Sequence, residues 1–66
     1  MNRLLGVDPG KRWVGLALTD SARTISRPLR VVDRQSESLG NHLRNIIESY
    51  DVGKIIVGYP TPLKID

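Results

Sequence analysis

The chain has 66 residues with no cysteine and one histidine, which limits it to one small domain. No disulfide, thiolate metal site or cysteine nucleophile can be built from it. Ten basic and seven acidic residues give a formal charge of +3, which either favours polyanionic partners or simply keeps the domain soluble. No apolar run can cross a membrane and no signal-peptide core precedes the first acidic residue, so we expect a cytoplasmic protein.

Two apolar segments separated by a tight turn predict an antiparallel hairpin. Residues 4–8 form an apolar run that ends in a carboxylate, and Pro9-Gly10 is a strong turn dipeptide. In residues 13–19 larger aliphatic side chains alternate with mostly small residues, which is typical of a strand with something packed close to one face.

Residues 24–33 predict a third strand at the edge of a sheet. Pro28 lies inside this segment and cannot donate a ladder hydrogen bond, which confines it to an edge. Four arginines and one acidic residue lie between Ser21 and Gln35. This basic stretch is either a track for a phosphate backbone or a solvated edge strand.

The apolar spacing after Ser36 is that of an amphipathic helix. One helical face would carry Leu39, Leu43, Ile46, Ile47 and Tyr50. Ser36 is the expected N-cap with Glu37 in the first turn, and Gly53 is the expected terminator. Residues 54–58 hold a β-branched run, which predicts a strand buried on both faces of a parallel sheet. We expect the aromatic rings of Trp13 and Tyr50 in the core.

The element order is therefore β-β-β-α-β, an α/β arrangement with a mixed sheet. A right-handed crossover would place the last strand parallel to an earlier one. The helix would cover one face of this sheet, and no segment of the sequence is left to cover the other. The uncovered face is a first indication that 66 residues make only part of a domain.

Asp8, Gly10, Lys11 and Arg12 are the residues best suited to chemistry. A carboxylate at the end of an apolar strand is held rigidly at the sheet rim, and oxygen ligands suit Mg²⁺ or Mn²⁺. Gly10 leaves room for a phosphate to approach the backbone, and Lys11 and Arg12 can neutralise that phosphate. The alternative is that this segment is simply a turn.

A second segment converges on the same rim if the last strand lies parallel to the first. Gly58 and Tyr59 would then end beside Asp8, at the position where open α/β sheets bind ligands. The alternative here is a plain exit from strand to loop.

Residues 5–20 resemble the opening of the YqgF/RuvX family, and they read LGVDPGKRWVGLALTD. The family pattern is approximately L-G-x-D-x-G-x-K/R-x-x-G-x-A-x-S/T-D, and every fixed position is met. Residues 27–29 match an Arg/Gln-Pro-Leu element before the helix, and residues 55–60 are similar to an I-V-V-G-L-P motif. The resemblance implies a ribonuclease H-like fold with three antiparallel strands, a helix and a fourth strand parallel to the first.

The resemblance also implies a metal-dependent nuclease of structured nucleic acid that hydrolyses phosphodiester bonds, with Asp8 as a catalytic carboxylate that binds Mg²⁺ or Mn²⁺. The expected role is processing of the pre-16S rRNA 5′ end during ribosome biogenesis in the bacterial cytoplasm. The alternatives are a Holliday junction resolvase acting on DNA, or a non-catalytic RNA-binding module of ribosome assembly. A nucleotide phosphotransferase of the actin and sugar-kinase type, which has a related fold, is a further alternative.

Two departures from the family pattern limit these expectations. Family members run to well over a hundred residues, and their later half supplies the other acidic ligands in an Asp-Glu-Arg motif. We therefore expect residues 1–66 to be the N-terminal part of a single nuclease domain that alone binds metal weakly and cleaves nothing. The family usually carries Asn-x-Asp-Gly after the Gly-x-Pro element, but residues 61–66 read TPLKID, so no role is assigned to Asp66.

Overall fold

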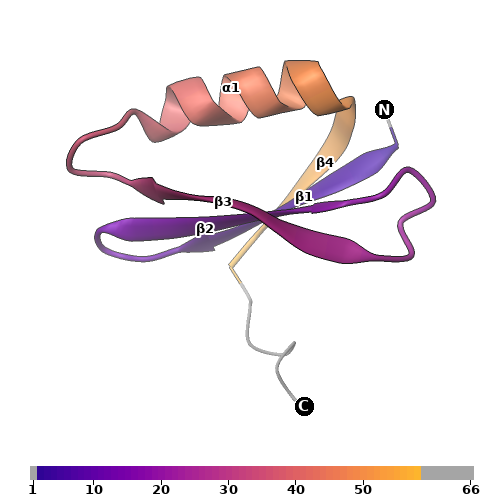
Figure 1. Ribbon diagram of the computed structural model, residues 1–66, viewed down its shortest axis with the longest axis horizontal. Helices are drawn as coiled ribbons and strands as arrows, with labels where there is room; N and C mark the ends of the chain where they lie inside the picture. The colour runs from indigo at the N-terminus through magenta and orange to yellow at the C-terminus, as the bar shows by residue number, and fades with distance from the viewer. Residues whose placement is uncertain (1, 59–66) are drawn as a thin grey trace, which may run out of the picture.

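A mixed four-stranded sheet and one helix make up the computed structural model, which describes residues 2–58. The elements in chain order are β1 (Arg3–Pro9), β2 (Trp13–Thr19), β3 (Ser26–Asp33), α1 (Leu39–Tyr50) and β4 (Val52–Val57). The spatial strand order is β3-β2-β1-β4, with β1 antiparallel to β2 and parallel to β4. Figure 1 shows α1 lying along one face of this sheet. The predicted α/β class and β-β-β-α-β order are confirmed.

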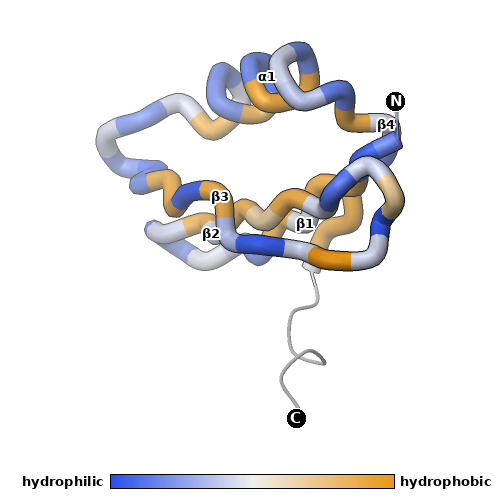
Figure 2. The backbone as a smooth tube through the Cα atoms, turned by 45° about the vertical axis from the view of Figure 1, so that its right-hand side comes forward, coloured by the Kyte–Doolittle hydropathy of each residue, from blue (hydrophilic) through white to orange (hydrophobic). Residues whose placement is uncertain are grey.

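Alternation along β1 and β2 separates a core face from an open face. Leu5 pairs with Leu18 and Val7 with Leu16, and all four side chains are buried. Successive residues of a strand point to opposite faces, so the intervening small residues of β2 lie on the face away from α1. In Figure 2 the apolar stretches of α1 are turned toward the strands. The two apolar surfaces form the core between helix and sheet.

Strand β3 is an edge strand, as its proline predicts, but it begins at Ser26 instead of residue 24. The N–H and hydroxyl of Thr24 both donate to the Asp20 carboxylate at 2.8 Å, which holds the chain in a turn at that point. Arg30 pairs with Leu16 and Pro28 with Ala17, so one extra residue forms a bulge beside the proline.

The expected boundaries of the helix are wrong at both ends. Ser38 is the N-cap, with its Oγ accepting from the N–H of Asn41 at 3.1 Å. Ser36 is still in the turn that leaves β3, where its N–H donates to Asp33 O at 3.1 Å. Asp51 ends the helix in the left-handed region, at φ 58°. The following chain enters β4 at Val52 without using a glycine.

Within residues 2–58 the core consists of eight buried aliphatic side chains, namely Leu5, Val7, Val14, Leu16, Leu18, Val32, Ile46 and Val52. Tyr50 packs against this cluster as expected. Trp13 does not, because it follows the alternation of β2 onto the open face and is 53% exposed. No helix within residues 2–58 is long and apolar enough to cross a membrane.

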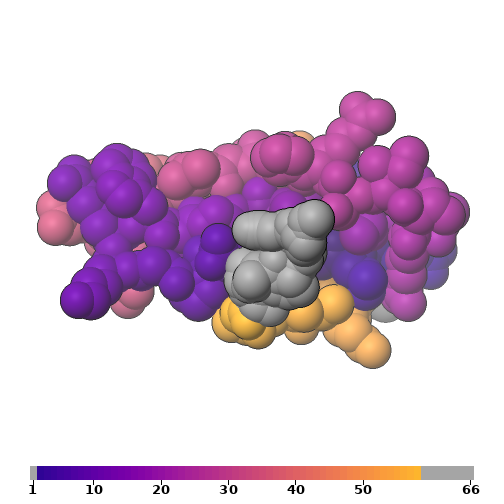
Figure 3. All heavy atoms as spheres, turned by 90° about the horizontal axis from the view of Figure 1, so that it is seen from below, coloured from indigo at the N-terminus to yellow at the C-terminus, as the bar shows by residue number. Residues whose placement is uncertain are grey.

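Strand β4 is not buried on both faces within the described residues. It pairs only with β1 there, and Ile55, Ile56 and Val57 are 39%, 44% and 63% exposed. Figure 3 views the molecule from below, where the sheet and not α1 faces the reader. The strand was expected to be interior because of its β-branched run, but burial of such a run requires neighbours that residues 2–58 do not supply.

Candidate active site at the carboxyl ends of strands β1 and β4

Asp8 lies one residue before the end of β1, a central strand of the sheet. It is paired with Gly15 across the antiparallel ladder. On the other side, the N–H of Gly58 donates to Val7 O at 2.8 Å and extends the parallel ladder past the end of β4. The predicted approach of Gly58 to Asp8 is confirmed, while Tyr59 lies outside the described residues.

The Asp8 side chain is exposed and belongs to the open face of the sheet, since its neighbour Val7 is buried under α1. It forms no hydrogen bond or ion pair with any residue in the 2–58 range. A Cβ added to Gly15 would lie 3.8 Å from the Asp8 Cβ. Any longer side chain there would begin to cover the carboxylate, so the glycine keeps one flank of Asp8 open.

Gly10 is required by the hairpin itself. A Cβ at this position would come within 2.5 Å of the carbonyl oxygen of Trp13, a separation that forces the backbone to move. The Gly10 carbonyl accepts from Arg34 Nη1 at 3.1 Å. A side chain is thus excluded at Gly10 because two backbone segments of the turn lie close together.

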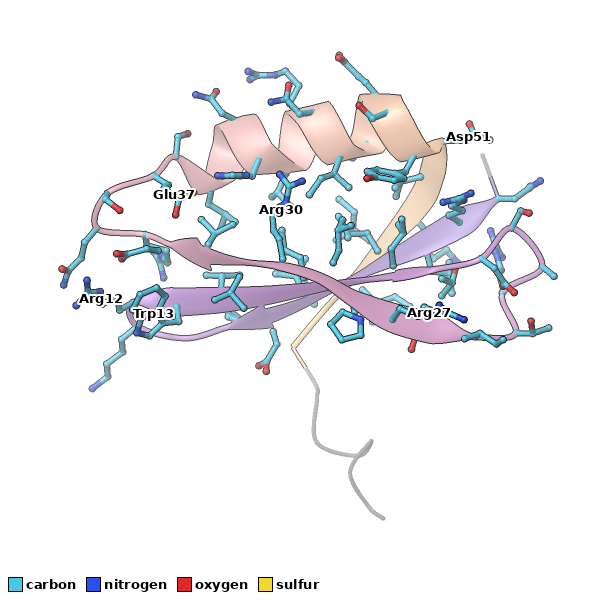
Figure 4. All side chains as sticks on the ribbon, viewed as in Figure 1. Arg12, Trp13, Arg27, Arg30, Glu37 and Asp51 are labelled. Carbon is cyan, nitrogen blue, oxygen red and sulfur yellow. The ribbon has the colours of Figure 1, made fainter. Side chains whose placement is uncertain are left out.

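The two basic residues of the hairpin have different surroundings. Lys11 is exposed and has no hydrogen bond or ion pair with the part of the chain that the structure describes. Arg12 donates from Nε to Oδ1 and from Nη2 to Oδ2 of Asp33, both at 3.0 Å. Its guanidinium also lies 4.7 Å from the centroid of the Trp13 ring. Figure 4 shows Arg12 and Trp13 side by side at one end of the sheet.

Asp33 also accepts a hydrogen bond from the backbone, in addition to those from the Arg12 guanidinium. Its Oδ1 accepts from the N–H of Gln35 at 3.1 Å. The Arg12 hydrogen bond, helped by this N–H, lowers the pKa of Asp33 to about 2. The same pair raises the pKa of Arg12. Asp33 is therefore held as a carboxylate, and its side chain is 14% exposed against 48% for Arg12.

A chain of polar contacts continues from Asp33 toward the helix. The N–H of Asp33 donates to Glu37 Oε2 at 3.2 Å, and Glu37 Oε1 lies 2.7 Å from His42 Nε2. Arg30 Nη1 lies 3.1 Å from His42 Nδ1. Because arginine can only donate, Nδ1 must accept, so these contacts fit a neutral ring that donates from Nε2. These contacts lower the pKa of Glu37, with the N–H of Asp33 as the larger cause and His42 second.

The sequence analysis assigned no role to His42, and no spacing in the sequence indicates its contacts with Glu37 and Arg30. Glu37 was expected in the first helical turn, where it would complement the helix dipole, but it precedes the helix and joins β3 to His42 instead. In Figure 4 Arg30 extends from β3 toward α1, on the side opposite the open face.

The described residues supply one carboxylate to a possible metal centre. No group of three or more His, Cys, Asp or Glu side chains with metal-binding geometry occurs within residues 2–58. A magnesium or two-metal site needs several oxygen ligands. These residues therefore do not by themselves form a cation site, and Asp8 can contribute only one ligand to such a site.

Comparison with known proteins gives a consistent family assignment. The sequence profile of the RuvX family, described as Holliday junction resolvase, matches residues 2–65. A relative from Dictyoglomus turgidum is 36% identical over 63 residues, covering 94% of this chain and 45% of the relative. One from Rubrobacter xylanophilus is 42% identical over 62 residues, covering 94% and 43%. Both are named "Putative pre-16S rRNA nuclease".

The chain spans less than half the length of these two relatives. No solved structure gave a significant match. The profile nevertheless covers nearly every residue, including the strand that carries Asp8, the hairpin after it and β4. The chain therefore belongs to the RuvX (YqgF) family, whose fold is ribonuclease H-like.

Proposed function

We propose that residues 1–66 are the N-terminal part of a ribonuclease H-like nuclease domain that hydrolyses phosphodiester bonds in structured nucleic acid. The observation that carries the proposal is the placement of Asp8. Its carboxylate stands at the carboxyl end of a central strand, beside the exit of the parallel strand β4. It is exposed and unpaired within residues 2–58.

Asp8 would act as a catalytic carboxylate and as one ligand of Mg²⁺ or Mn²⁺. When bound, such a metal activates water or stabilises the leaving oxygen of a phosphodiester. Because residues 2–58 hold no group of three or more potential metal-binding side chains, we place the remaining carboxylates in the part of the relatives that this chain does not match. The 66-residue chain alone should bind Mg²⁺ weakly and cleave nothing.

The hairpin of residues 10–12 would form the nucleic-acid side of the site. Gly10 and Lys11 lie two and three positions after Asp8 and are exposed. Lys11 has no partner within residues 2–58, whereas Arg12 is already paired with Asp33. A positive charge next to the carboxylate would hold the phosphate backbone near the scissile bond and compensate part of its charge.

The proposed substrate is precursor rRNA, with processing of the pre-16S 5′ end as the specific reaction. Support comes from the names of the matched relatives. Acting on rRNA precursors, the protein would work in the cytoplasm and take part in ribosome biogenesis. The family description favours one alternative, resolution of four-way DNA junctions.

Cleavage assays on two substrates test the proposal. Residues 1–66 are joined to the portion of the D. turgidum relative beyond the matched region, and a pre-16S rRNA fragment and a four-way DNA junction are offered with Mg²⁺. We expect cleavage of the rRNA fragment by the joined protein and none by residues 1–66 alone. Preferential cleavage of the junction would support the resolvase alternative. A folded joined protein that binds RNA and cleaves neither substrate would instead indicate a non-catalytic assembly module.

A further inference from the structure

We propose that Arg12 is a positioning residue that fixes the hairpin of residues 9–12 against the loop between β3 and α1, and that Lys11 is the phosphate-binding side chain of this hairpin. The assignment to Lys11 rests on the proposed function. The assignment to Arg12 rests on contacts alone. The two adjacent basic residues therefore have different roles, which the sequence alone does not distinguish.

One edge of the Arg12 guanidinium is already occupied. Its guanidinium reaches both carboxylate oxygens of Asp33 in a fork at 3.0 Å and lies over the Trp13 ring at 4.7 Å. Paired hydrogen bonds of this kind fix direction as well as charge. A phosphate that approached Arg12 along its Nε–Nη2 edge would have to displace a carboxylate that also accepts from the N–H of Gln35. This edge of Arg12 is thus closed to a ligand, and its charge is already compensated by Asp33.

Asp33 is a fixed anchor for this fork. Its own N–H donates to the Glu37 carboxylate at 3.2 Å, and its carbonyl accepts from the N–H groups of Ser36 and Glu37 at 3.1 and 2.8 Å. The side chain that holds the hairpin is therefore attached to a backbone that is tied on both sides. Because Asp33 is held in this way, it fixes the position of the Arg12 guanidinium.

A second arginine holds the hairpin at its backbone. The N–H of Arg34 donates to Arg12 O at 2.8 Å, and Arg34 Nη1 donates to Gly10 O at 3.1 Å. The hairpin is thus joined to the β3–α1 loop through both side chain and main chain. These contacts link residues more than twenty positions apart and fix the turn that immediately follows Asp8.

The same contacts engage three of the four arginines between Ser21 and Gln35, and Arg27 is the one without a partner in residues 2–58. Arg34 donates to Gly10 O in the hairpin, Arg30 contacts His42, and Arg23 donates to Asn2 O at 2.6 Å. Lys11 is exposed at the hairpin tip and has no partner in residues 2–58. A lysine ammonium is a point charge on a flexible stem, which can follow a phosphate without a fixed approach direction.

Amide hydrogen exchange in the 66-residue chain, without nucleic acid, tests the role of Arg12. The reporter is the Arg34 N–H, whose acceptor is Arg12 O. We expect its exchange to accelerate by about tenfold in Arg12→Ala and also in Arg12→Lys, because lysine keeps the charge but cannot form the fork. Lys11→Ala is the matched control and should leave the rate unchanged. Unchanged exchange in Arg12→Ala, or full rescue by Arg12→Lys, would overturn the positioning role.

The salt dependence of binding to a fluorescein-labelled RNA hairpin tests the role of Lys11. We expect Lys11→Ala to reduce the slope of log K against log salt concentration by about 1. The charge-neutral double variant Arg12→Ala/Asp33→Ala should keep the parent slope. A reduced slope in the double variant with none in Lys11→Ala would overturn the assignment. If the parent chain bound no RNA, the Lys11 role would fall with the proposed function, while exchange would still decide the role of Arg12.

Discussion

Replacing Ile46 with alanine tests how the helix is held on the sheet. Ile46 is the fully buried residue of α1, at 1% exposure, and the other apolar residues of that face are only partly buried. Removing an isoleucine side chain beyond Cβ from a closed core costs about 2–5 kcal/mol. A chain of this length is expected to have about 3–10 kcal/mol of stability in total. Ile46→Ala should therefore remove about a fifth of it or more.

The matched control is Ile56→Ala on the open face, where the side chain is 44% exposed. The same atoms are deleted there, but about half of their surface is already in water and no closed cavity remains. We expect a loss of about 1 kcal/mol. Urea titrations followed by circular dichroism give both values on equal terms. Equal losses at the two positions would refute the reasoning, because they would mean that the open face is covered as fully as the core in solution.

Three further substitutions test the polar and backbone features. Because the folded-state pKa of Asp33 is lowered from 3.8 to about 2, this carboxylate stabilises the fold above its ordinary pKa and the contribution is lost as pH falls toward 2. Asp33→Asn should flatten the thermal stability profile between those values, and an unchanged profile would exclude the pair as a source of stability. Gly10→Ala should lower the melting temperature more than Gly58→Ala. The first places a Cβ 2.5 Å from a backbone oxygen, whereas the second meets no atom within 4 Å and strains only a φ of 73°, at about 1 kcal/mol. Ser38→Ala should cost about 1 kcal/mol through loss of the N-cap. Ser36→Ala should cost less stability. A larger loss at Ser36 than at Ser38 would mean that Ser36 is the N-cap, as expected from the sequence.

The strands and the buried face of the helix could be predicted because each follows from a short-range period. The alternation in residues 13–19 and the spacing of the apolar residues after residue 38 both depend on which side chains meet the core. The caps could not be predicted in the same way. Two serines two positions apart are both suitable N-caps, and the choice of Ser38 depends on Asp33 O, which holds the N–H groups of Ser36 and Glu37 in a turn.

The candidate site was predictable where its parts are contiguous in sequence or follow from a rule of chain topology. Asp8 and the hairpin after it form one contiguous motif, and Gly58 reaches the same rim through the rule for parallel strands. The pairing of Arg12 with Asp33 spans 21 positions, and no sequence spacing indicates which of several acids an arginine will meet. The exposure of Trp13 has a different origin, since the alternation of β2 places it opposite the buried Val14, and the expectation of an aromatic core residue overrode that pattern.

Substitution of Asp8 by asparagine tests whether this carboxylate takes part in cleavage. The change removes the charge but keeps the shape of a side chain that has no partner in residues 2–58, so stability should stay within about 0.5 kcal/mol. The measurement is single-turnover cleavage of the pre-16S rRNA fragment by the joined protein, with RNA affinity measured in parallel. We expect a loss of about a thousandfold or more in rate with affinity largely retained. Cleavage at the parent rate by Asp8→Asn would contradict this expectation and reduce Asp8 to a residue of the turn.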